Sequence, residues 1–141
     1  MIEKHASATW TGSLKDGHGV IDSQSGALSG ISYTFATRFE DKKGANPEEL
    51  IGAAHAACYA MFLSALMGAE KIAVEKIEAV STITLDPATE GSPTVTKAHL
   101  KVRAKADAPE AKIRDLAEKA KEGCPISKLL KAEITLEVTV G

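Results

Sequence analysis

The chain has 141 residues, a formal net charge of −2 and 26% charged side chains. This length suits one domain with a hydrophobic core, so we expect a single domain over residues 1–141. Because acidic and basic residues are mixed along the chain, its charge favours neither nucleic acid nor an anionic membrane surface as a partner.

We also expect no membrane segment. The amino terminus lacks a signal-like apolar core, and no apolar run reaches the roughly 18 to 20 residues that cross a bilayer. The protein is therefore expected to be cytoplasmic. In a reducing cytosol, its two cysteines are not expected to form a purely structural disulfide.

Three short strand-like runs occupy the first forty residues, at 7–12, 18–23 and 31–39. Turn residues separate them, which is typical of an antiparallel meander.

The strongest helix signal follows a charged loop. Asn46 is suited to the N-cap, Pro47 to the first helical position, and Glu49 stands three residues after the cap. From residue 50 to residue 67 the sequence is apolar or small almost all the way round. Such a helix must be enclosed on most sides, and it is the predicted core helix.

Two alternating segments, 74–85 and 94–106, predict half-buried strands. An amphipathic helix is expected over 109–123, and a last strand over 132–140. The order indicates an α+β domain in which antiparallel sheet packs on helices. The core helix has more apolar surface than one small sheet can cover, so we expect a homodimer.

The two cysteines lie in unlike settings. Cys58 is inside the apolar helix, where burial alone would raise its pKa, so a reactive Cys58 needs a buried cation beside it. Cys124 precedes Pro125 at the start of a short helix, which favours ionisation. The residues alone do not decide which thiol reacts first.

Arg38, which follows a strand-like stretch, is the best candidate for that cation, and Glu48 in the first helical turn could orient it. Ten residues of helix separate Glu48 from Cys58 by about 15 Å along the axis. Either Arg38 lies between them, or the helix breaks near Gly52, or the pairing crosses subunits.

A metal site is an alternative for the same residues. His55 and Cys58 are three residues apart and could share a helix face, with Cys124 and His99 completing a ligand set. No CxxC or HxxxH spacing supports this alternative.

Two long segments, TRFEDKKGANPEELIGAAHAACYAMFLSALMG and KAKEGCPISKLLKAEITLEV, closely resemble the OsmC/Ohr family, in particular its OsmC-like branch. The similarity runs over nearly the whole chain. It implies antiparallel sheets wrapped around two central helices in an intertwined homodimer.

By motif, the resemblance makes Cys58 the peroxidatic cysteine, Cys124 the resolving cysteine, Glu48 the first carboxylate of NPEEL, and Arg38 the arginine of TRFE. The implied activity is a thiol peroxidase, active in stress defence, that reduces organic hydroperoxides and, more weakly, hydrogen peroxide. It would pass through a Cys sulfenic acid and an intramolecular disulfide, and a dithiol, of lipoyl type in this family, would reduce it again. No metal, flavin, haem or other cofactor is implied.

Apolar residues near these positions could line a pocket for the organic part of the peroxide: Phe39, Tyr59, Met61 and Phe62. The alternative to an enzyme is a non-catalytic dimer that binds an apolar ligand or a metal.

Overall fold

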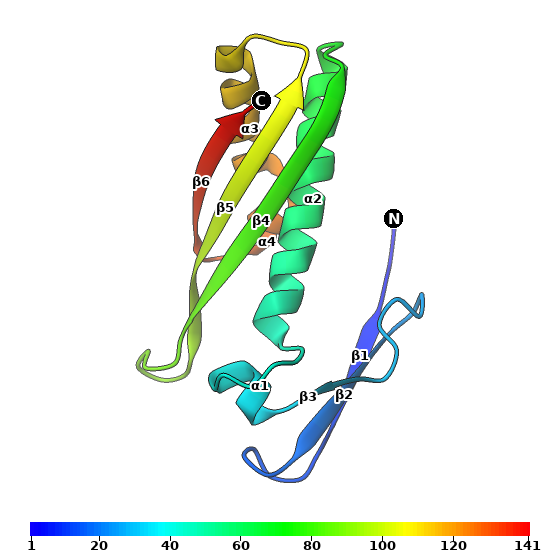
Figure 1. The fold of residues 1–141 in the computed structure, drawn as a ribbon. Coiled ribbons are helices and arrows are strands. Elements are labelled where there is room, and N and C mark those ends of the chain that lie inside the picture. The colour runs from blue at the N-terminus through cyan, green and yellow to red at the C-terminus, as the bar shows by residue number, and fades with distance from the viewer. The chain divides into compact units, whose positions relative to one another are not determined.

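The computed structural model describes all residues 1–141. The chain forms two compact units, Met1–Leu50 and Ile51–Gly141, which are described separately below (Figure 1). The architecture is α+β, as expected, and it contains two three-stranded sheets and four helices. A single domain over residues 1–141 stays a prediction.

The first unit begins with an antiparallel meander. Strands β1 (Ala6–Thr11), β2 (His18–Ser23) and β3 (Ile31–Tyr33) pair in the order β1-β2-β3. The rings of Trp10 on β1 and Tyr33 on β3 lie 5.5 Å apart across the meander. The three predicted strands are therefore confirmed, but the third ends early.

After Tyr33 the chain turns into a short helix, α1 (Phe35–Phe39), so the expected strand over 31–39 is wrong beyond Tyr33. The cause is local: the Thr34 hydroxyl accepts the backbone N–H of Thr37, and the Thr37 hydroxyl accepts that of Thr34. This reciprocal cap favours a helical turn over an extended one. Arg38 consequently lies on a helix.

Helix α2 (Pro47–Ala69) begins where the sequence predicts. The side-chain oxygen of Asn46 accepts the backbone N–H of Glu49 at 2.8 Å, as an N-cap does. The same side chain donates to the Thr37 carbonyl at 3.2 Å, which ties the helix start to α1. Because α2 runs through Gly52 without interruption, the break considered at that residue does not occur.

The second unit contains the sheet of β4 (Val74–Asp86), β5 (Thr94–Ala106) and β6 (Glu133–Val140), in the order β4-β5-β6. Strands β4 and β5 are antiparallel, but β5 and β6 are parallel. The expectation of wholly antiparallel sheet is therefore wrong for β6. The helices α3 (Glu110–Gly123) and α4 (Pro125–Leu129) form a crossover between these two strands, which a parallel pair requires.

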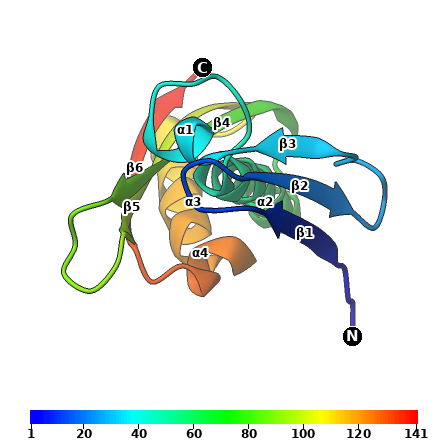
Figure 2. The ribbon, with the colours of Figure 1, turned by 90° about the horizontal axis from the view of Figure 1, so that it is seen from below.

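In this unit α2 and α3 lie against one face of the sheet (Figure 2). Apolar side chains of both helices meet those of β5, where every second residue is buried. The resulting core consists of Tyr59, Leu63, Met67, Leu100, Val102, Ala104, Ile113, Leu116, Ala117, Ala120 and Cys124.

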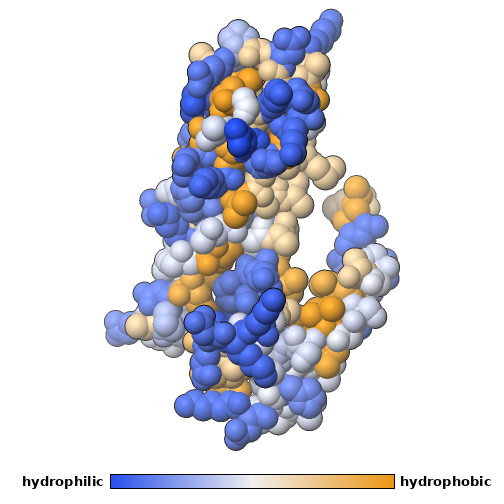
Figure 3. Space-filling model, in the orientation of Figure 1, coloured by the Kyte–Doolittle hydropathy of each residue, from blue (hydrophilic) through white to orange (hydrophobic).

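The other side of α2 is exposed in the single chain, and Figure 3 shows apolar surface along this helix. The chain alone therefore does not enclose α2 on most sides. By length and composition α2 would suffice to cross a bilayer, so the expectation that no apolar run is long enough is wrong. The core helix of a soluble protein meets the same criterion, and α2 contributes Tyr59, Leu63 and Met67 to the core.

Candidate active site

The two cysteines lie together in the second unit. Cys58 is on α2 and Cys124 is at the junction of α3 and α4, and their sulfur atoms are 3.3 Å apart. Both are free thiols, and their sulfur atoms are close enough for one thiol to donate a hydrogen bond to the other. Sixty-six sequence positions separate them, so only the packing of α2 against the α3–α4 junction brings them into contact.

Local features of the α3–α4 junction place Cys124. The Cys124 backbone N–H donates to the Ala120 carbonyl at 3.0 Å, which closes α3. Its sulfur accepts the backbone N–H of Ser127 at 3.4 Å, so Cys124 is also the N-cap of α4. Gly123 permits the close approach of the end of α3 to α2, because a Cβ there would lie 2.8 Å from the Phe62 ring on α2.

The surroundings separate the pKa values of the two thiols. Burial raises the pKa of Cys58, and the neighbouring Cys124 raises it further, against one favourable hydrogen bond from the Ile126 backbone. Burial acts in the same direction on Cys124, but hydrogen bonds from Ser127, Cys58 and Ile126 outweigh it and leave the pKa of Cys124 lowered. Cys124 is the more acidic thiol in the single chain.

Solvent exposure favours the other thiol, Cys58, as the first to react. Cys124 is fully buried, whereas Cys58 is partly exposed. A small molecule from solvent therefore meets Cys58 first. The more accessible sulfur is the one that needs further help to ionise.

His55 is a buried polar side chain one turn before Cys58. Its Nδ1 lies 2.7 Å from the Ser81 hydroxyl oxygen on β4, and its Nε2 lies 2.9 Å from the Ser127 hydroxyl oxygen on α4. Burial lowers the pKa of His55, which favours the neutral ring. A lone histidine in an apolar helix is the one sign of this buried position in the sequence, and its distant serine partners leave no sign there.

These contacts argue against the metal alternative. Both ring nitrogens of His55 already face serine hydroxyls. No group of three His, Cys, Asp or Glu side chains is arranged to hold a metal ion. His99 is on β5, where its Nδ1 lies 2.6 Å from the Thr135 hydroxyl oxygen.

Arg38 and Glu48 form an ion pair in the first unit. The Arg38 Nη2 donates to Glu48 Oε1 at 2.8 Å, and its Nε donates to the two carboxylate oxygens at 3.1 and 3.3 Å. The Glu48 side chain is mostly buried and that of Arg38 is 37% exposed. The guanidinium also lies 5.2 Å from the centre of the Phe39 ring. These contacts fix the plane of the guanidinium and leave part of it open to solvent.

The four apolar residues considered for a peroxide pocket have different positions. Tyr59 is fully buried and its hydroxyl donates to the Ala117 carbonyl at 2.9 Å, so it is a core residue. Phe62 packs against the same core, and Met61 is 77% exposed. Phe39 belongs to the first unit, where it stacks on Phe35.

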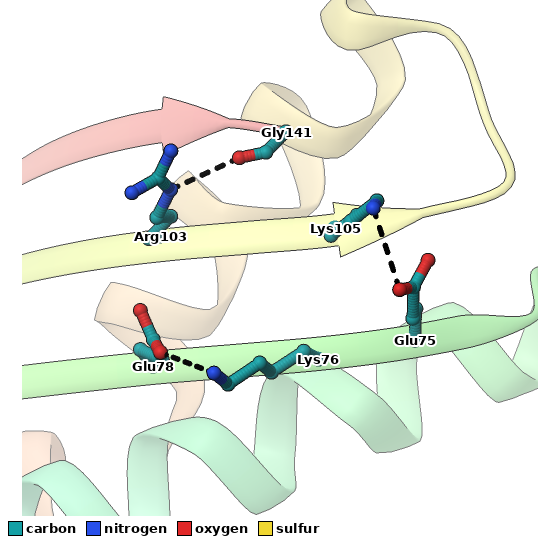
Figure 4. A pocket seen from close by; sticks show the side chains of 6 residues that line it. All are labelled: Glu75, Lys76, Glu78, Arg103, Lys105 and Gly141. Carbon is teal, nitrogen blue, oxygen red and sulfur yellow. Dashed lines mark hydrogen bonds and ion pairs between the residues drawn. The ribbon is translucent and has the colours of Figure 1, made fainter.

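A hollow on the outer face of the β4-β5-β6 sheet contains neither cysteine (Figure 4). Its charged side chains neutralise one another: Lys105 pairs with Glu75 at 3.3 Å and Lys76 with Glu78 at 2.6 Å. Arg103 donates to the Gly141 carbonyl at 2.9 Å. The lysines of this hollow are thus paired with carboxylates on a solvated surface, where such pairs contribute little.

A sheet-and-helix unit that holds a solvent-accessible thiol against a buried, more acidic one is an arrangement suited to thiol redox chemistry. Comparison with known proteins identifies the class. The family model described as OsmC-like protein matches residues 40–139. The chain is also 44% identical over 137 residues to the peroxiredoxin OsmC of Escherichia coli K12, which covers 96% of this chain and 95% of that protein.

Solved structures agree on the fold. The organic hydroperoxide resistance protein OhrB of Bacillus subtilis superposes with a TM-score of 0.70 at 25% identity, covering 97% of this chain and 98% of that one. An OsmC-like protein of unknown function from Vibrio cholerae gives 0.76 at 18% identity, covering 99% of this chain and 100% of that one. The chain belongs to the OsmC-like family, and it is an enzyme of the peroxidase class.

Proposed function

We propose that the protein is a cysteine-based peroxidase that reduces organic hydroperoxides, and hydrogen peroxide more weakly, in defence against oxidative or osmotic stress. Its relatives carry the names peroxiredoxin and organic hydroperoxide resistance protein, which supports this substrate class. The observation that carries the mechanism is the 3.3 Å separation of the Cys58 and Cys124 sulfur atoms.

In the first step the Cys58 thiolate attacks one oxygen of the peroxide. The O–O bond breaks, the sulfur is oxidised to a sulfenic acid, and the leaving oxygen takes a proton to become an alcohol, or water from hydrogen peroxide. The partial exposure of Cys58 supports its role in this step, because Cys124 is fully buried.

In the second step the Cys124 sulfur attacks the Cys58 sulfenic sulfur. An S–S bond forms, the S–O bond breaks, and water leaves with the proton of the Cys124 thiol. An external dithiol, of the lipoyl type, then exchanges with the disulfide and restores both thiols. These steps require no metal or organic cofactor.

Arg38 and Glu48 complete the proposed site. A guanidinium beside Cys58 would lower the pKa that burial raises, and its donors would stabilise the negative charge that develops on the leaving oxygen. The hydrogen bonds that Arg38 donates to Glu48 hold the guanidinium in one orientation, which supports this role. Glu48 is ten residues before Cys58 on an unbroken helix, about 15 Å along its axis, so Arg38 reaches Cys58 either within its own chain or across subunits.

A homodimer is the proposed assembly. Four exposed residues of α2 follow spacings of three and four, the pattern of a helix seam that packs on another helix: Ala54, Ala57, Met61 and Ser64. Met61 is 77% exposed in the single chain. A second copy that covered this side of α2 would supply the enclosure that its apolar sequence demands. We place the dimer in the cytoplasm, where two free thiols stay reduced between turnovers.

The test is a thiol titration combined with mass spectrometry. One equivalent of cumene hydroperoxide should remove both free thiols of the wild type and join the peptides that contain Cys58 and Cys124. The variant C58S should consume no peroxide. The variant C124S should react once and then stop as an overoxidised or mixed-disulfide species. Two thiols that survive the peroxide, in a folded protein, would contradict the proposal and favour a non-catalytic binding protein.

A further inference from the structure

His55 is a buried titratable group that the proposed chemistry does not use. It is fully buried, yet it has a hydrogen-bonding partner on each side, Ser81 on β4 and Ser127 on α4. Ser127 is also buried, and it belongs to the short helix whose N-cap is Cys124. A chain of polar groups therefore leads from the sheet, through His55, to the buried thiol.

The direction of this chain follows from counting protons. A neutral imidazole has one N–H and one bare nitrogen, so it donates to one serine and accepts from the other. If Nε2 were bare, it would take the hydroxyl proton of Ser127. If Nε2 carries the proton, it donates to the Ser127 oxygen, and the Ser127 hydroxyl proton is free for another acceptor.

The Cys124 sulfur is the acceptor that the helix cap offers. The backbone N–H of Ser127 already donates to it at 3.4 Å, which places this residue against the sulfur, and hydrogen bonding by the Ser127 side chain is among the causes that lower the pKa of Cys124. Only the Nε2–H form of His55 lets the Ser127 hydroxyl serve both neighbours, as acceptor from His55 and donor to Cys124. In that form Nδ1 accepts the hydroxyl proton of Ser81.

We propose that His55 is a positioning residue for the second step: in its Nε2–H form it turns the Ser127 hydroxyl toward Cys124 and so stabilises the Cys124 thiolate that closes the disulfide. The role of His55 in the second step rests on the proposed function. The hydrogen-bond chain from His55 to Cys124 is independent of that function. The same stabilisation makes Cys124 the better leaving thiolate when the external dithiol opens the disulfide.

Other titratable groups near Cys124 do not replace this chain. Cys58 and Tyr59 of α2 face it, and Glu118 of α3 acts on Tyr59. Tyr59 is buried, its hydroxyl proton is directed to the Ala117 carbonyl, and its pKa is raised, so it stays neutral and does not donate to the sulfur.

The test is made in a Cys58→Ser background, where Cys124 is the only thiol and peroxide chemistry plays no part. Thiolate absorbance is followed against pH, with a variant that lacks both cysteines as the blank. Ser127→Ala should raise the pKa of Cys124 by roughly one unit, about a tenfold loss of thiolate near neutral pH. His55→Leu should give a similar shift, and His55→Gln, whose amide can donate to Ser127 and accept from Ser81, should restore most of it.

The matched control is Thr135→Val, which removes the hydroxyl partner of His99 on β5 and should leave the Cys124 titration unchanged. In the unmutated protein, nitrogen NMR of the His55 ring should show a proton on Nε2 and none on Nδ1, which tests the proposal even where a variant does not fold.

An Nδ1–H ring, or a Ser127→Ala variant with an unshifted Cys124 titration, would overturn the proposal. In active protein, with both cysteines present, the same serine substitution should slow disulfide closure after sulfenic acid formation and leave the first step unchanged. A failed peroxidase test alongside a shifted thiol titration would refute the proposed function and not the hydrogen-bond chain.

Discussion

At the scale of single residues, the two thiols differ in acidity and in exposure: the more acidic thiol is the less exposed one. Cys124 is the more acidic because Ser127 and Ile126 donate to its sulfur, but it is closed to solvent. Cys58 is partly exposed, but its remaining burial and the neighbouring Cys124 raise its pKa. A peroxidase that attacks with Cys58 therefore needs a positive charge beside that sulfur, which is the task we assign to Arg38.

Replacing Arg38 by lysine tests this assignment. Lysine keeps the charge but loses the planar fork that binds Glu48 through two nitrogens, so the charge is no longer held in one orientation. We expect kcat/KM for cumene hydroperoxide to fall by about 10²-fold, with a small change in thermal stability. Arg114→Lys is the control, since it alters a similar but exposed Arg–Glu pair, and it should leave the rate unchanged. Equal rates in both variants would remove Arg38 from the mechanism.

Much of the residue-scale description could be drawn from the sequence, because cysteine, arginine and glutamate each stand in a distinctive motif. The partners of His55 could not. Ser81 and Ser127 are 26 and 72 positions away, and a serine in a strand or a short helix has no local pattern that marks it as a histidine partner.

At the scale of elements, the contact of α2 with β4 depends on a glycine. A Cβ on Gly52 would lie 2.8 Å from the Ser81 carbonyl oxygen, on the residue that also bonds His55. The helix can approach the strand this closely only because Gly52 has no side chain. The same approach holds His55 within hydrogen-bonding distance of β4.

Gly52→Ala is therefore expected to destabilise the protein by about 1–3 kcal/mol, since backbone atoms must move to relieve the overlap. Gly68→Ala is the matched control in the same helix, where a Cβ meets nothing within 4 Å in the single chain. There, alanine should stabilise the helix by about 0.5–1 kcal/mol. Urea unfolding of both variants measures the difference. A Gly52→Ala variant as stable as the wild type would show that the helix does not depend on this contact.

Element types were largely predictable, because caps and alternation act locally. The N-cap at Asn46 and the alternating β5 are examples. Two elements were not. Helix α1 depends on a reciprocal threonine cap inside a sequence of strand-forming residues. Alternation in β6 indicates a strand but carries no information on whether it pairs parallel or antiparallel with β5.

At the scale of the whole molecule, helix α2 is more apolar than its burial in a single chain explains. The helix is apolar on nearly all sides, but the single chain buries only one of them. An exposed side of small and apolar residues, Met61 among them, is a surface that a second copy can cover. The proposed homodimer therefore follows from the exposed apolar side of helix α2.

Ala57→Glu should disrupt such a dimer, because it places a charge in the middle of the exposed side of α2. We expect the mass measured by sedimentation to change from about twice 14.8 kDa to 14.8 kDa at micromolar concentration. Ala111→Glu, at an exposed position of the polar helix α3, is the control and should leave the mass unchanged. A wild type that sediments as a monomer would refute the dimer.

The long sequence interval between the two thiols also affects stability during turnover. A bond between Cys58 and Cys124 would close a loop spanning 66 positions and restrict the unfolded chain, worth about 4 kcal/mol on a chain-entropy model. The oxidised intermediate would then resist heat and proteolysis better than the resting enzyme. Survival of a protease pulse would thus report the redox state of a sample without any thiol reagent.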